Sequence, residues 1–262
     1  MRLFWAALGV EWLKARRAWL PWVAAAGFLL LPIVDGLFMI ILKDPEAARQ
    51  MGIIGIKAEL TAGTADWNSL FGILNMGTSI AGLILYAIVT SWIFGREFAN
   101  QTAKELLALP TPRKSIVLAK FTIVFAWVLG VTLVIFLVGM GIGFLVRIPG
   151  WSSALAWASL KLIFTVAVLT FMLMPLVAFI ASAFRSYLPA LGWAFLSIAL
   201  GQIMAVLGWG PWFPWSVPAT LTEFMSETPE TLHFNGLVSV FLVFLIGIAT
   251  TLRWWQRADH AY

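Results

Sequence analysis

Long, nearly uncharged apolar segments are the feature that most limits how this chain folds. Each of six segments is long enough to cross a bilayer core of about 30 Å as a helix. Helices are expected because lipid offers no partner for free backbone groups, and the segments lack the alternation of a β-barrel strand. The sequence therefore predicts an all-α polytopic membrane protein with six transmembrane helices. The predicted spans are Ala18–Leu42, Trp67–Phe94, Ile116–Val146, Leu160–Phe184, Tyr187–Leu207 and Gly236–Leu252.

Composition supports the same class of protein. Of the 262 residues, 61% are hydrophobic and 11% are charged, whereas a soluble domain carries about 25% charged residues. The longest hydrophilic stretches, Lys43–Asp66 and Arg96–Ser115, are too short to form a core of their own. We therefore expect residues 1–262 to form a single transmembrane domain. The chain has no cysteine and two histidines, so we predict no catalytic, metal or cofactor-binding residues in it.

Basic residues indicate the orientation. Six crossings place both termini on one side, and twelve of the 17 lysines and arginines fall on that side. Cytoplasmic loops are enriched in these residues, so both termini are predicted to be cytoplasmic. Tryptophans gather near both predicted interfaces, with Trp255 at the inner one and Trp67 at the outer one. The net charge of +5 then reflects loops that face anionic lipid headgroups, and nucleic acid is not an expected partner.

The first segment, residues 1–17, has the pattern of a helix that lies at the membrane surface. Ala7 and Val10 follow one helical line of apolar residues, while Glu11 and Lys14 are expected to reach water. Two interpretations of this helix stay open. It is either a membrane anchor or a lever that transmits force to the bundle.

The cytoplasmic loop 96–115 specifies a short helix between the second and third spans. Thr102 and Glu105 have the spacing of a capping box, and Pro110 ends the helix. Thr111 is then expected to cap the third span, with Pro112 at its first helical position.

Three leucines stand out in this charged loop. Leu106, Leu107 and Leu109 would be exposed together on the short helix, and such a cluster needs an apolar partner surface. Lipid and another protein are both candidates on this ground alone.

The residues of this loop also resemble a known family, the type-2 ATP-binding-cassette (ABC) exporter permeases. Similarity extends to the segment Glu11–Arg17 and to Trp215–Pro218, and it is greatest to the short six-span permeases of bacitracin or lantibiotic resistance. Gln101 departs from the family pattern, which has glycine at this point. The loop residues that carry the resemblance are Glu97, Thr102, Leu106, Leu107, Pro110, Arg113 and Lys120.

The resemblance implies a permease subunit of an exporter in the cytoplasmic membrane of a bacterium or archaeon. Such a permease moves a hydrophobic or amphipathic substrate outward. It pairs with a second permease, as a homodimer or heterodimer, and the pair sits on cytosolic ABC ATPase subunits within the lipid bilayer. The short loop helix would be the coupling helix. Its expected coupling residues are Glu97, Thr102, Glu105, Leu106, Leu107, Leu109, Pro110 and Arg113.

ATP chemistry is expected elsewhere. This chain has no glycine-rich phosphate loop of the form G-x-x-x-x-G-K-[ST]. We therefore expect ATP and Mg²⁺ in the partner ATPase, no cofactor in this chain and no enzyme activity of its own. The alternatives are a non-ABC secondary transporter or channel, or an accessory membrane subunit.

Polar residues inside the spans are candidates for a substrate pathway. Asn68, Asn75 and Ser79 share one face of the second span, which fits helix packing, a pathway lining or a permease–permease interface. Asp35 is the one acid inside a span; it either faces a cavity or extends towards the membrane surface. Pro32 and Gly36 beside it predict a local break in the helix.

The outer loop 208–235 contains four prolines and three tryptophans. The resemblance implies short re-entrant helices there, whereas composition alone also fits a loop that rests on lipid headgroups.

Overall fold

The computed structural model describes residues 2–43, 64–100, 102, 111–222 and 234–257. The predicted coupling helix, with Glu105, Leu106, Leu107, Leu109 and Pro110, lies outside the described residues. So does the outer loop beyond Thr222. In the described part all regular structure is helical, and six helices are long and apolar enough to span a membrane. The predicted fold class and all six spans are confirmed.

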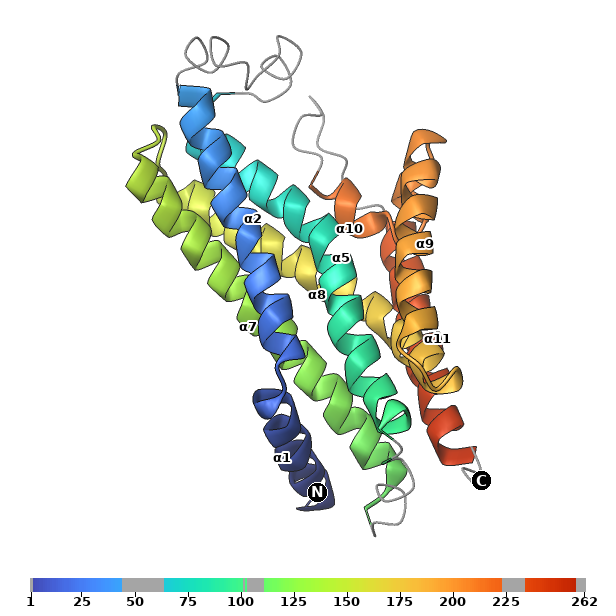
Figure 1. Ribbon diagram of the computed structural model, residues 1–262. Coiled ribbons are helices and arrows are strands. Elements are labelled where there is room, and N and C mark those ends of the chain that lie inside the picture. Colours follow the sequence, from blue (N-terminus) through green and yellow to red (C-terminus); the bar gives the residue numbers. More distant parts are fainter. Residues whose placement is uncertain (1, 44–63, 101, 103–110, 223–233, 258–262) are drawn as a thin grey trace.

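Seven long helices and two short ones make up the described chain (Figure 1). The long helices are α1 (Arg2–Arg17), α2 (Leu20–Lys43), α5 (Trp67–Ala99), α7 (Arg113–Val146), α8 (Ser153–Ala183), α9 (Leu188–Val206) and α11 (Phe234–Arg257). The short ones are η1 (Gly210–Trp212) and α10 (Val217–Thr220).

Several helices extend beyond the apolar segments that predicted them. Helix α5 starts after Asp66, whose side chain accepts a hydrogen bond from the Ser69 amide at 2.8 Å, and continues through Arg96 and Glu97 to Ala99. The hydrophobic pattern ends at the first charges, but the backbone helix does not. At the start of α7, Pro112 is the capping residue, one position after the predicted cap.

Helices α5 and α8 form the centre of the bundle. They make the most extensive contact in the described structure, with α2 and α7 on one side of them and α9 and α11 on the other (Figure 1). Helix α1 and the end of α11 lie at the same end of the bundle, as an even number of crossings requires.

Close contact between α8 and α11 depends on a glycine. A Cβ atom at Gly247 would lie 2.8 Å from the carbonyl carbon of Pro175, which is too close for any other residue. One turn later, Thr251 donates a hydrogen bond to the Pro175 carbonyl at 3.2 Å. Near the helix end, the indole of Trp255 donates to Ser182 at 3.0 Å.

Two tryptophans predicted to lie near the membrane interfaces are buried by neighbouring helices. Trp255 is fully covered, and Trp67 is 1% exposed. Trp67 packs edge-on against Trp151, with ring centroids 4.6 Å apart. Both rings lie near an end of their helix, but the sequence pattern does not show that neighbouring helices cover them.

Helix α2 is continuous, so the predicted break at Pro32 and Gly36 is wrong. Gly36 instead allows close packing, because a Cβ atom at this position would clash with Ile142 of α7. The small residue therefore serves the contact between two helices and not a hinge.

The described part of the outer loop forms two short helical segments, η1 and α10. The hydroxyl of Ser216 joins them by donating to the Gly210 carbonyl at 2.6 Å, and α10 packs against α5, α8 and α11. This part of the loop is folded onto the bundle. Its depth in the membrane stays a prediction.

Candidate functional site

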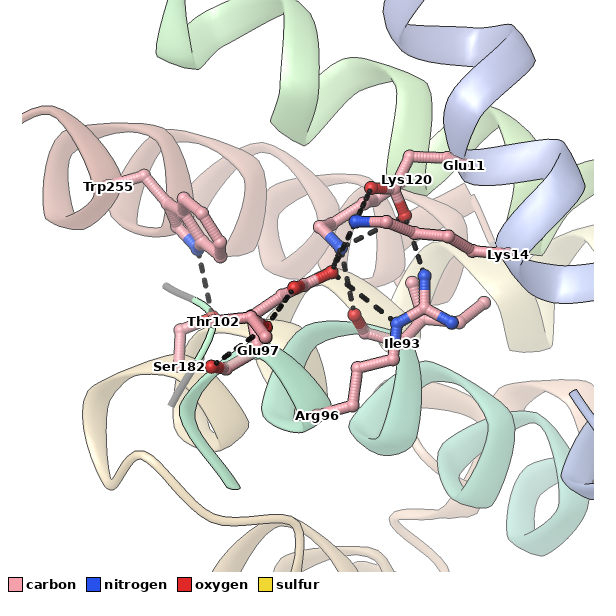
Figure 2. A network of polar contacts seen from close by, with 9 residues as sticks. All are labelled: Glu11, Lys14, Ile93, Arg96, Glu97, Thr102, Lys120, Ser182 and Trp255. Carbon is pink, nitrogen blue, oxygen red and sulfur yellow. Dashed lines mark hydrogen bonds and ion pairs between the residues drawn. The ribbon is translucent and has the colours of Figure 1, made fainter. Parts of the chain in front are cut away.

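Five charged side chains from three helices meet at the end of the bundle that carries α1 (Figure 2). Glu11 and Lys14 come from α1, Arg96 and Glu97 from the last turn of α5, and Lys120 from the second turn of α7. We call these five residues the charge cluster. It contains three cations and two carboxylates, and it joins α1 to both helices that flank the loop 96–115.

Lys120 is the most buried member of the charge cluster, with no exposed surface. Its ammonium group donates to Glu11 at 3.0 Å, to Glu97 at 3.1 Å and to the backbone carbonyl of Ile93 at 3.1 Å. A lysine has three N–H donors, so every donor has a partner. Such complete pairing is what makes a buried charge tolerable.

Glu11 connects α1 to the other two helices, and its predicted exposure to water is wrong. It is 2% exposed, and its carboxylate accepts from Lys120 and Arg96 at 3.0 Å each and from Lys14 at 3.2 Å. Glu11 lies one turn after buried Ala7, on the face of α1 that packs against α7. The sequence signal for the burial of Glu11 is that it lies on the same helix face as the apolar residue Ala7.

Glu97 is surrounded by donors in a similar way. Its carboxylate accepts from Lys14 at 3.0 Å and from Lys120 at 3.1 Å. The Thr102 hydroxyl donates to the second carboxylate oxygen at 2.9 Å. Thr102, predicted to cap the coupling helix, therefore contacts Glu97 directly.

The pKa of Glu11 reflects two opposed influences. Burial raises the pKa of its carboxyl group, but the positive charges of Lys120, Lys14 and Arg96 outweigh burial. The resulting pKa lies below the ordinary value, so Glu11 is ionised at neutral pH.

Arg113 lies at a second junction between helices. Its guanidinium group donates to the backbone carbonyls of Trp255 and Gln256, each at 3.1 Å. These carbonyls belong to the last turn of α11, where free carbonyls need donors. Arg113 therefore links the start of α7 to the end of α11. Its predicted coupling role stays a prediction.

The predicted polar residues of α5 are not brought together at one site. Asn68 is exposed, and Asn75 donates to Ser159 of α8 at 3.2 Å. Ser79 donates to the Met76 carbonyl at 2.7 Å and borders a cavity of about 70 Å³ between α5, α9 and α10. Within this chain, Asn75 thus takes part in helix packing.

Asp35 lies apart from the charge cluster. It is 3% exposed and is buried on the face of α2 that packs against α5 and α7. Its side chain therefore does not extend along α2 to the membrane surface. Neither carboxylate oxygen has a hydrogen-bond partner within the described residues.

Comparison with known proteins places this architecture in a family. The family described as ABC-2 family transporter protein matches residues 7–201, a range that includes the whole charge cluster. The bacitracin transport permease protein BCRB of Bacillus licheniformis is 26% identical over 182 residues, which cover 69% of this chain and 86% of that relative. No solved structure matches the chain. The chain belongs to the ABC-2 family of transporter proteins and is a multi-pass membrane subunit of an ABC transporter in the bacterial cell membrane.

Proposed function

We propose that this permease exports a hydrophobic or amphipathic substrate from the cytoplasm, driven by ATP that a separate ABC ATPase hydrolyses. The family match supports an ABC transporter subunit, and the printed name of the relative concerns transport of bacitracin. The sequence has no phosphate loop of its own, so ATP and Mg²⁺ would be bound by the ATPase.

The charge cluster is the observation that carries the proposed mechanism. Glu97 lies at the start of the loop 96–115 and Lys120 follows the loop, and both bind side chains of α1. A force applied to this loop would therefore act on α5, α7 and α1 together. Helix α1 leads directly into α2, so the movement would reach a spanning helix.

The partners follow from this arrangement. Two cytosolic ATPase subunits would seat on the loops of two permeases, which form a homodimer or a heterodimer in the lipid bilayer. Leu106, Leu107 and Leu109 would enter an apolar groove on the ATPase, with Glu105 and Pro110 defining the ends of the coupling helix.

Export of this kind requires that the end with the charge cluster face the cytoplasm. Because the chain has no cysteine, single cysteines can be introduced at Ala103 and at Thr228 without a background signal. In intact cells, a membrane-impermeant maleimide is expected to label the cysteine at 228 and to reach the one at 103 only after permeabilisation. Labelling of position 103 in intact cells would contradict the orientation and the proposed docking site.

A further inference from the structure

A groove along α2 has no role in the mechanism above. It lies between α2 and α5 and has a volume of about 680 Å³. Its wall is almost entirely apolar, and it extends from Gly27 to Ile41 of α2, a length of about 20 Å at 1.5 Å per residue. Leu30 and Val34 at its edge are 58% and 61% exposed, so the groove opens on the surface that would face lipid.

Among the described residues that line the groove, Asp35 is the one with an ionisable side chain. As described above, it is almost completely buried and both of its oxygens lack a donor in the described part of the chain. A buried carboxyl group without a hydrogen bond is costly, and most of all within a membrane. A donor that arrives from outside the described residues would remove this cost.

We propose that the groove binds a long-chain cationic amphiphile, with its apolar chain between α2 and α5 and its ammonium group at Asp35. An ammonium group can donate hydrogen bonds to the carboxyl oxygens and compensate the charge of a carboxylate, whereas an anion can do neither, and no basic residue is among the described residues that line the groove. On the α5 side the groove is lined by Ile73, Gly77 and Ala81, and Leu31 of α2 packs closely against Gly77. Neighbouring atoms cover both carboxylate oxygens of Asp35. The bound ammonium group therefore displaces some of the side chains that cover them.

Binding to this groove requires neither ATP nor the ATPase. That the bound molecule is also the exported substrate rests on the proposed function. Failure of the binding experiment would leave export intact, and failure of export would leave binding measurable. The two proposals can therefore be tested separately.

The test uses a photoreactive diazirine derivative of dodecylamine with the full-length permease in phosphatidylcholine vesicles. Labelling is expected to be saturable, to map to groove residues such as Leu30 and Val34, and to be displaced by dodecylamine at lower concentrations than by dodecanol. Asp35→Asn keeps the shape of the side chain. It is expected to weaken displacement by dodecylamine about tenfold or more and to leave displacement by dodecanol unchanged.

A matched variant separates charge from shape. Val34→Ala shortens an exposed apolar residue of the groove wall, so it should weaken displacement by dodecylamine and by dodecanol to the same degree. The preference of the wild-type permease for dodecylamine over dodecanol is measured without any variant. It therefore still decides the test if Asp35→Asn fails to fold. Equal displacement by the two molecules would overturn the proposal. So would labelled peptides that map only to a contact between two permease copies, because a second copy would then occupy the groove.

Discussion

Replacing Lys120 with methionine is expected to destabilise the folded permease by about 3–5 kcal/mol. Methionine fills a similar volume but leaves Glu11 and Glu97 without their shared partner and the Ile93 carbonyl without a donor. Removing one partner of a buried ion pair costs more free energy of folding than the intact pair contributes, because the remaining charge stays desolvated without a partner. The measurement is thermal unfolding of the purified permease in detergent.

Lys114→Met is the matched control for this change. Lys114 belongs to the same helix, α7, but is exposed, so its loss should leave the unfolding temperature almost unchanged. Equal unfolding temperatures for Lys120→Met and Lys114→Met would contradict the account of the charge cluster as a buried junction.

Replacing Leu106 and Leu107 together with aspartate is expected to abolish association with the ATPase subunits. Two adjacent leucines in a charged loop would each lose an apolar contact with the ATPase, and two carboxylates would be desolvated at the same place. Insertion of the permease should be unaffected, because the loop lies between two complete spanning helices. The measurement is co-purification of the ATPase with the membrane-inserted permease.

The control adds the same charges to the same loop without removing a leucine. Gln101→Asp with Ala103→Asp is expected to retain most of the ATPase association. If the leucine variant co-purifies with the ATPase as well as this control does, the coupling-helix assignment is wrong.

The spanning helices could be predicted from sequence because the bilayer imposes a minimum apolar length. Their ends could not, since α5 continues through Arg96 and Glu97 and α11 continues to Arg257. Charges end a hydrophobic segment but do not end a helix when they have partners or lie outside the bilayer.

The candidate site could be predicted only in part. Glu97, Thr102 and Lys120 were identified through the loop pattern, but the partner of Lys120 on α1 was not. Glu11 and Lys120 are 109 positions apart, and periodicity within one helix does not show which helix packs against it. An acid in a surface helix is predicted to reach water. Glu11 is buried because three cations pair with it, and these are Lys14 from the next turn of α1, Arg96 from α5 and Lys120 from α7.

For Asp35, too, the sequence alone does not show which helices pack around the residue. The sequence identified an acid inside a span, and the alternatives of a cavity and of extension to the surface could be separated only by the packing of α2 against α5 and α7. The proline and glycine beside it indicated a break, whereas the neighbouring helix explains the glycine.

The central claim is that the charge cluster transmits ATPase movement from the loop 96–115 to α1 and the spans. The most direct measurement is the amount of substrate transported per ATP hydrolysed by the permease–ATPase complex in proteoliposomes, with a labelled amphipathic molecule that the wild-type complex transports as the substrate. Glu11→Gln keeps the shape of the side chain and removes the charge that binds three cations, while Arg17→Gln changes an exposed residue of the same helix. We expect Glu11→Gln to lower transport per ATP about tenfold while hydrolysis continues, and Arg17→Gln to match the wild type. Wild-type transport per ATP in Glu11→Gln would contradict the claim.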